Sequence, residues 1–192
     1  MGKLVEAIPH QSLHELVNTG NVREYLIRCI VSQQLSIKVA PIIYKRFVDL
    51  YKGKFPNNIK IVNTPVEDLR SCGLSLQKSN YIKNIAEYFH EHKIKDESFQ
   101  SMSDEEVLRS LTEIKGVGRW TAEMVLMFCL GRQDVFSPTD YGIMTAMKSI
   151  YKIRKEKKEL EKKMISIAEK WRPYRSMACL YLWAYKDSKI TI

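Results

Sequence analysis

The chain has 192 residues, of which 45% are hydrophobic, and a formal net charge of +9. This composition supports a buried core and excludes a disordered chain, and the excess of Lys and Arg (31) over Asp and Glu (22) favours a polyanionic partner. Solvated lysine-rich helices would give the same balance, so charge alone does not decide. The length predicts one unit over residues 1–192, or two closely packed helical lobes.

The sequence suggests an intracellular protein. Its N-terminus lacks a charged-then-apolar signal pattern, and no apolar run is long enough to span a bilayer. The cysteines lie too far apart in the sequence to form a metal-ligand pair, so neither zinc nor an iron–sulfur cluster is suggested. We expect a monomer without a membrane partner, in the cytoplasm or nucleoid of a prokaryote or the nucleus of a eukaryote. The cysteines are Cys29, Cys72, Cys129 and Cys179.

Helical periodicity dominates the chain, because apolar residues recur at three- and four-residue spacing. No alternating pattern is long enough for a strand, and residues 60–63 are too short to count. We therefore expect an all-α fold. Residues 1–20 are expected to be irregular apart from a weak helix at residues 12–17. The expected helices cover residues 22–31, 36–51, 65–71, 77–92, 103–111, 119–129, 140–150, 155–171 and 174–186.

Two helix starts carry capping-box signals. Residues 64–67 read Thr-Pro-Val-Glu, with proline at the first helical position, and residues 103–106 read Ser-Asp-Glu-Glu. Further on, residues 152–163 are dense in charges of both signs. At helical spacing such a run predicts a solvated face and not a nucleic-acid arm.

A glycine-cornered break separates two of the helices. Residues 115–118 read Lys-Gly-Val-Gly, which is too short for anything but a tight turn. Glycine lacks a Cβ, so Gly116 and Gly118 allow positive φ and a close approach of another backbone. Because the turn opens a helix, unpaired N–H groups and the positive end of the helix dipole make it suitable for a phosphate. An ordinary helical hairpin would show the same pattern.

Asp140 follows the second glycine after 22 residues and precedes the next helical run. Aspartate at such a position commonly caps a helix. With the hairpin just upstream, the same carboxylate is also suited to act on DNA. Breaking an N-glycosidic bond develops positive charge at the sugar C1′, which a fixed carboxylate stabilises. Both roles fit the sequence.

The segment Leu-Thr-Glu-Ile-Lys-Gly-Val-Gly-Arg-Trp-Thr-Ala, together with the Asp-Tyr pair at residues 140–141, resembles the helix-hairpin-helix and Gly/Pro-Asp (HhH-GPD) motif of base-excision DNA glycosylases. It is most similar to the bacterial 3-methyladenine DNA glycosylase II branch, and the resemblance covers residues 20–186. It implies a compact two-lobed helical fold, with the helix-hairpin-helix at 105–129 and the catalytic loop at 134–141. No stretch of this chain would form the N-terminal β-rich domain of the longer bacterial enzymes, which puts the substrate range in question.

The same resemblance assigns roles to particular positions. Asp140 matches the catalytic aspartate. The base pocket would include Trp120, Trp183 and Tyr174. Both tryptophans also suit a core position, but the polar neighbours Arg119 and Thr121 favour the pocket role for Trp120. The loop with Gln34 would fill the gap left by the flipped nucleotide, with an exposed turn as the alternative. Leu76 would be a second plug, although a C-cap glycine followed by a turn explains Gly73 equally well. The implied DNA contacts are Lys115, Gly116, Val117, Gly118, Arg119, Gln33, Gln34, Leu35 and Leu76. In many relatives the hairpin also holds a monovalent cation, here through the carbonyls of Thr112, Ile114 and Val117.

Trp120 and Asp140 together indicate the reaction. Related branches place a nucleophilic lysine where this chain has Trp120, so we expect a monofunctional hydrolase without lyase activity. No second acidic residue pairs with Asp140 by spacing. This fits an alkylated purine, such as 3-methyladenine or 7-methylguanine, whose cationic base leaves without a proton. No redox or metal cofactor is implied, and the expected partner is duplex DNA with a damaged base.

Two alternatives remain at this point. The first is a glycosylase for a neutral lesion, such as uracil or an oxidised purine, which would need a proton donor or hydrogen bonds to the base edge. The second is a non-catalytic hairpin module that only docks on DNA.

Overall fold

The computed structural model describes residues 1–10, 13 and 15–188. The chain divides into two compact units. The first unit comprises Met1–Asn18 and Leu126–Ile192, and the second comprises Thr19–Val125. The second unit is therefore inserted between two segments of the first. The single catalytic unit expected over residues 1–192 stays a prediction.

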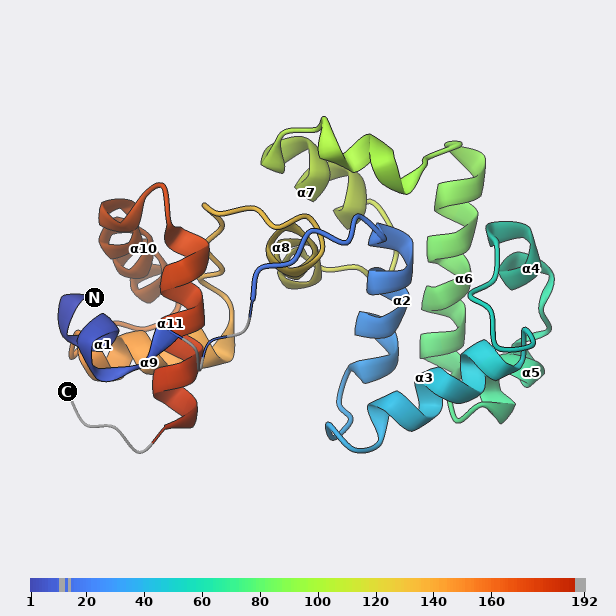
Figure 1. Cartoon of the computed structure of the whole chain (residues 1–192), viewed down its shortest axis with the longest axis horizontal. Helices are drawn as coiled ribbons and strands as arrows, with labels where there is room; N and C mark the ends of the chain where they lie inside the picture. The colour runs from blue at the N-terminus through green and yellow to red at the C-terminus, as the bar shows by residue number, and fades with distance from the viewer. Residues whose placement is uncertain (11–12, 14, 189–192) are drawn as a thin grey trace. The chain divides into compact units, whose positions relative to one another are not determined.

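The second unit is built of helices, labelled in Figure 1. Helix α6 is its centre, because α2, α4 and α5 all pack against it, and α2 and α6 run side by side (Figure 1). The helices are α2 (Val22–Ser32), α3 (Ala40–Asp49), α4 (Asn58–Asn63), α5 (Val66–Ser71), α6 (Leu76–Glu91), the 3-10 helix η2 (Asp96–Gln100), α7 (Asp104–Thr112) and α8 (Arg119–Phe128). The last residues of α8, from Leu126 on, belong to the first unit.

In the first unit α11 packs against α9 and α1, and η3 packs against α10 (Figure 1). Ile143, Met147, Cys179 and Leu182 are fully buried, so the apolar faces of α9 and α11 contribute to the core of this unit. The helices are α1 (Gly2–Ala7), α9 (Tyr141–Ile150), α10 (Lys157–Ala168), the 3-10 helix η3 (Glu169–Trp171) and α11 (Arg175–Asp187).

The all-α prediction is confirmed for the described residues, which contain no strand beyond an isolated bridge between Asn18 and Leu130. The capping box at Ser103 and Glu106 is also confirmed, with both reciprocal hydrogen bonds formed. Within residues 1–10, 13 and 15–188, no helix has the length and apolarity that a membrane crossing requires.

Three expectations about helices were wrong. Residues 2–7 form α1, in a stretch expected to be irregular, and residues 58–63 form α4, whose N-cap Asn57 accepts a hydrogen bond from the amide of Lys60. The expected capping box at residues 64–67 does not form. Pro65 is itself the N-cap, and the Thr64 hydroxyl donates to the carbonyl of Lys60 instead.

One helix boundary and one expected helix also differ from expectation. Helix α3 begins at Ala40, four residues later than expected, because residues 37–39 form a turn first. The weak helix expected at residues 12–17 falls partly on Ser12 and His14, which lie outside the described residues, and residues 15–17 are not helical.

Candidate active site

Asp140 is the N-cap of α9, as predicted. Its Oδ1 accepts a hydrogen bond from the amide of Ile143 at 2.8 Å, which satisfies one of the unpaired N–H groups of the first turn. The residue is 8% exposed. Burial of this kind strengthens the electrostatic effect of a carboxylate on any charge that develops beside it.

Trp183 of α11 contacts the same carboxylate. Its indole Nε1–H donates to Oδ1 of Asp140 at 2.8 Å. The half-buried ring lies 5.8 Å, centroid to centroid, from the ring of Phe128. The sequence suggested either a pocket wall or a core tryptophan. The structure adds a direct hydrogen bond from the indole to the carboxylate, which the sequence did not predict.

Gly142, the second residue of α9, makes room for this contact. A Cβ at this position would lie 2.8 Å from Cδ1 of Trp183 and 3.2 Å from Oδ1 of Asp140. The first of these distances is too short for two carbon atoms, so the rigid indole would have to move. Sequence reasoning missed this role, although glycine inside a helix costs about 1 kcal/mol relative to alanine and was therefore a signal.

Replacing Trp183 by Phe keeps an aromatic ring beside Phe128 and removes the hydrogen bond to Asp140. Hydrogen bonds to charged groups contribute about 1.5–3 kcal/mol. If the bond orients the carboxylate, we expect the single-turnover rate of base release to fall roughly tenfold or more, because each ~1.4 kcal/mol on a barrier is a factor of ten. A DNA-binding titration should show little change. An unchanged rate would mean that Trp183 acts only by stacking.

The loop that leads to Asp140 is fastened to the start of α11. Asp134 accepts a hydrogen bond from Nε of Arg175 at 2.7 Å and forms an ion pair with Arg172. The hydroxyl of Ser176 accepts from the amide of Val135 at 2.9 Å. Burial alone would raise the pKa of Asp134, but the hydrogen bonds from Arg175 outweigh it, so the pKa lies below its ordinary value. Residues 172–176 therefore hold the loop that leads to Asp140.

Two tyrosines of the first unit are exposed. Tyr174, predicted to line the base pocket, is the N-cap of α11 and is 64% exposed. Tyr141, the second residue of the Asp-Tyr pair, was assigned no role from the sequence; it directly follows Asp140 and is 72% exposed. Its position next to the carboxylate makes it a further candidate for contact with DNA.

The hairpin lies in the second unit, between α7 and α8. Gly116 has φ of +107°, and a Cβ there would lie 2.3 Å from Cγ of Tyr81. Gly118 differs, because its φ is not positive and a Cβ added to it would meet no atom within 4 Å. The prediction of positive φ thus holds for Gly116. Gly118 leaves open space at the start of α8, where a phosphate could approach.

The side chains around the hairpin divide into exposed and buried groups. Lys115 is exposed, and its carbonyl accepts a hydrogen bond from Asn84 at 2.9 Å. Val117 is buried, so its side chain is not available to DNA. For the predicted cation site, the carbonyl of Ile114 already accepts from the amide of Val117 at 2.9 Å. The monovalent cation stays a prediction.

Helix α8 begins with an exposed charged and aromatic pair. Trp120 is 42% exposed, so it is not a core tryptophan. Arg119 forms an ion pair with Glu123 at 2.9 Å, and Glu123 is almost fully buried. The carboxylate thereby fixes the guanidinium of Arg119, which sequence reasoning had considered only as a free contact to phosphate.

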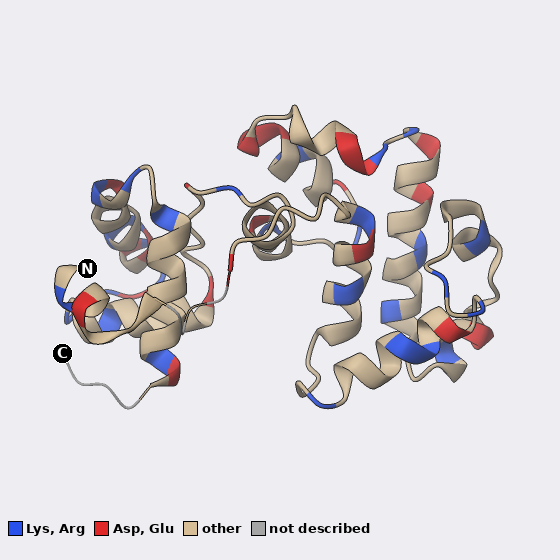
Figure 2. Ribbon diagram, viewed as in Figure 1, with Lys and Arg blue, Asp and Glu red and all other residues tan. Residues whose placement is uncertain are grey.

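Two exposed turns of the second unit correspond to the predicted DNA-probing elements. In the Gln34 loop (residues 32–36), Gln34 is exposed with φ of +57°, while Gln33 and Leu35 are half-buried. In the Leu76 turn (residues 73–78), Leu76 is 54% exposed. Ile37, just after the Gln34 loop, is 93% exposed and was missed. Lys and Arg occur on α2, α3 and α6 around these turns (Figure 2).

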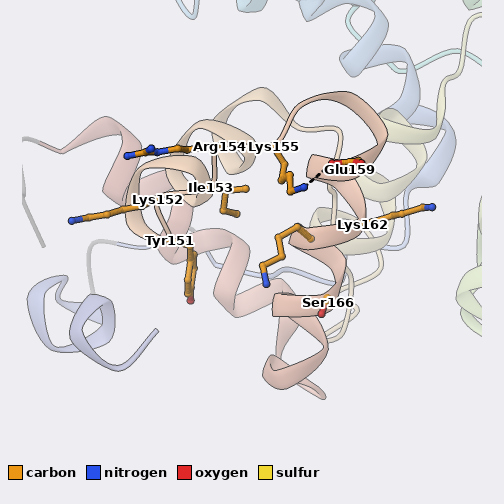
Figure 3. Close-up of a pocket in the computed structure, with 9 residues that line it drawn as sticks. Tyr151, Lys152, Ile153, Arg154, Lys155, Glu159, Lys162 and Ser166 are labelled. Atoms are coloured by element: carbon orange, nitrogen blue, oxygen red, sulfur yellow. Dashed lines mark hydrogen bonds and ion pairs between the residues drawn. The ribbon is translucent and has the colours of Figure 1, made fainter.

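The charge-dense run after α9 is a solvated surface, as predicted. It lines a cavity of about 570 Å³ formed by residues between Tyr151 and Ser166 (Figure 3). Lys152 and Arg154 point away from this cavity, and Lys155 is paired with Glu159 at 2.9 Å. The lining contains neither Asp140 nor Trp183, so this cavity is not part of the candidate active site.

Within each unit, the structure brings some predicted site residues together. Asp140 and Trp183 are in direct contact in the first unit. The hairpin, Trp120, the Gln34 loop and the Leu76 turn all belong to the second. A clamp of Trp120 and Trp183 on one base would involve both units and stays a prediction.

The sequence is similar to known proteins over most of its length. Residues 27–173 match the HhH-GPD superfamily base excision DNA repair protein family. DNA-3-methyladenine glycosylase 1 of Schizosaccharomyces pombe is 37% identical over 98% of this chain and 82% of its own length. The DNA-3-methyladenine glycosylase of Saccharomyces cerevisiae is 36% identical over 93% of this chain and 63% of its own length.

The chain is also similar to solved structures of 3-methyladenine DNA glycosylases. The chain superimposes with a TM-score of 0.84 on the Schizosaccharomyces pombe 3-methyladenine DNA glycosylase in complex with abasic DNA, at 32% identity, covering 100% of this chain and 93% of that one. A DNA-3-methyladenine glycosidase from Bacillus halodurans superimposes with a TM-score of 0.83 at 33% identity, covering 97% and 84%.

Proposed function

Because this chain belongs to the HhH-GPD superfamily of base excision DNA repair proteins, we propose that it is a monofunctional DNA glycosylase that excises alkylated purines, such as 3-methyladenine and 7-methylguanine, from duplex DNA. The names of relatives at 36–37% identity support this substrate class. The observation that carries the proposal is the Asp140 carboxylate, held by the start of α9 on one side and by an indole on the other.

Asp140 would act on the sugar of the extruded nucleotide. As the N-glycosidic bond breaks, positive charge develops at C1′ and the ring oxygen, and a fixed carboxylate stabilises it. The two hydrogen bonds to Oδ1 hold the group in place before the substrate arrives, so little reorganisation is needed during the reaction. The carboxylate would also orient or deprotonate the attacking water.

The lack of an acid paired with Asp140 in the sequence fits an alkylated purine. Glycoside hydrolysis usually uses a second carboxyl group to protonate the leaving group. An N-alkylated purine carries its positive charge already and leaves as a neutral base. Stacking and cation–π attraction to indoles such as Trp183 would hold the cationic base, at about 1–2 kcal/mol for each such contact.

Trp120 supports hydrolysis without strand cleavage. A lyase reaction needs an amine that forms a Schiff base with C1′, and an indole cannot supply one. The product would therefore be the free base and an intact strand with an abasic site. Contacts to the strand would come from the start of α8, where Gly118 leaves room for a phosphate.

The test is mass analysis of the bases released from methylated duplex DNA, with deaminated and oxidised duplexes in parallel. We expect free 3-methyladenine and 7-methylguanine to be released. We expect neither cleavage of the DNA strand nor a covalent protein–DNA complex after borohydride treatment. Release of uracil or oxidised purine alone would favour a neutral-lesion glycosylase. Tight DNA binding with no base released from any of the duplexes would favour a docking module.

A further inference from the structure

Lys78 connects two turns that lie far apart in the sequence. Its Nζ donates hydrogen bonds to the carbonyl of Val31 at 2.9 Å and to that of Gln33 at 2.6 Å. Both carbonyls belong to the C-terminal end of α2, where the last carbonyls have no partner within the helix and the dipole is negative. The ammonium group therefore caps α2 from outside, at the point where the Gln34 loop begins.

The backbone of Lys78 belongs to the other turn. Lys78 is the third residue of α6, and its amide donates to the hydroxyl of Ser75, the N-cap, at 3.2 Å. Leu76, the exposed residue of this turn, lies two positions earlier. Since α2 and α6 run side by side (Figure 1), one residue joins the Gln34 loop to the Leu76 turn.

The position of Lys78 is unfavourable for its own helix. A positive charge in the first turn opposes the helix dipole. Burial also lowers the pKa of Lys78 from its ordinary value. The two carbonyls of α2 offset both effects. The side chain of Lys78 therefore stabilises the C-terminal end of α2 and not its own helix, α6.

The Gln34 loop needs such support. Gln34 adopts φ of +57°, in the left-handed region that L-residues with a side chain rarely occupy. Gln33 precedes it in an extended conformation, with ψ of 129°. Lys78 binds the carbonyl of Gln33, which is part of the peptide unit that leads into Gln34.

We propose that Lys78 is a positioning residue that fixes the Gln34 loop relative to the Leu76 turn, so that both enter the DNA together and keep the damaged nucleotide extruded. The proposal rests on the proposed glycosylase function. Lys78 itself touches neither the base nor the sugar in this scheme; it acts through Gln34 and Leu76.

Lys83 provides a matched control on the same helix. Its Nζ donates to the carbonyl of Thr64 at 2.8 Å, and Thr64 is the C-cap of α4. Lys83 thus makes the same kind of contact to the end of a helix, but not to either DNA-probing turn. Lys78→Met and Lys83→Met each keep the apolar stem and remove the ammonium group.

The experiment measures DNA opening and base release separately. Duplexes carry 2-aminopurine next to an abasic analogue, so that unstacking raises fluorescence without any chemistry. Single-turnover release of 7-methylguanine is followed from duplex and from single-stranded DNA. For Lys78→Met we expect little fluorescence increase on binding and release from duplex slowed roughly ten- to a hundredfold, the penalty for a misplacement of about 1 Å. Release from single-stranded DNA, which has no partner strand to open, should be unaffected.

The outcomes separate the two proposals. If Lys83→Met matches the wild type while Lys78→Met loses the fluorescence signal, the positioning role is supported. If both variants behave alike, or if Lys78→Met slows release equally from single and double strands, the role is only structural and the inference is wrong. If the wild-type protein releases no base, the proposed function fails, and the fluorescence difference between the variants still decides the role of Lys78.

Discussion

Replacing Asp140 by Asn will abolish base release while leaving the fold intact. Asparagine caps helices as well as aspartate, so the side-chain oxygen can still accept from Ile143 and Trp183. The substitution removes the negative charge and replaces the second carboxylate oxygen, an acceptor, by an amide NH2 group, a donor. We expect the single-turnover rate to fall by at least about 10²–10³, the range for losing one preorganised electrostatic contact in a transition state. The free energy of unfolding should change by less than about 1 kcal/mol.

Asp187→Asn is the matched control, because it makes the same chemical change at an exposed carboxylate of the same unit. Rates are measured on methylated duplex DNA, and stability by thermal unfolding. If Asp140→Asn released base at the wild-type rate, this carboxylate would have no part in the mechanism. A large fall in melting temperature would mean that lost activity reflects the capping role instead of the charge.

Replacing Gly116 by Ala should produce the largest loss of stability among single-methyl changes in the hairpin. The new Cβ would lie 2.3–2.7 Å from three atoms of the Tyr81 ring, at φ of +107°. Overpacking of this kind costs about 1–3 kcal/mol, and positive φ about 1–2 more. We expect the free energy of unfolding to fall by roughly 2–4 kcal/mol in a denaturant titration.

Gly118→Ala adds the same methyl two residues later, where it meets no atom within 4 Å. Its cost should not exceed about 1 kcal/mol, the penalty for alanine at a helix start. If a phosphate binds at this point, however, the methyl will obstruct it, and DNA affinity will fall while stability is kept. Equal affinities for Gly118→Ala and wild type would place the phosphate elsewhere.

The sequence predicted the features that depend on local chemistry. Ser103 was identified as a helix start from its capping box, and Asp140, with Thr139 as the alternative, because aspartate commonly caps helices; both are N-caps in the structure. The exposed Trp120 was distinguished from a core tryptophan by its polar neighbours. The all-α fold followed from periodicity along the whole chain.

The contacts that sequence did not predict join distant segments. Trp183 lies 43 residues from the carboxylate it binds, and Lys78 lies 45 residues from Gln33. No local pattern indicates which hydrogen-bond donor meets which acceptor over such separations. Thr64 is a further case in which the local pattern failed. Its hydroxyl bonds to Tyr51 and to the carbonyl of Lys60 in α4, and the expected capping box does not form.

Both ends of the loop at residues 134–140 are held by one helix. Arg175, at the start of α11, holds Asp134, and Trp183, eight residues later on the same helix, holds Asp140. A displacement of α11 would therefore carry both carboxylates with it and preserve their spacing. Substitutions in the loop between Asp134 and Asp140 could change the surface that contacts a damaged base. The orientation of the Asp140 carboxylate would be kept, so substrate preference could change while the chemistry stays the same.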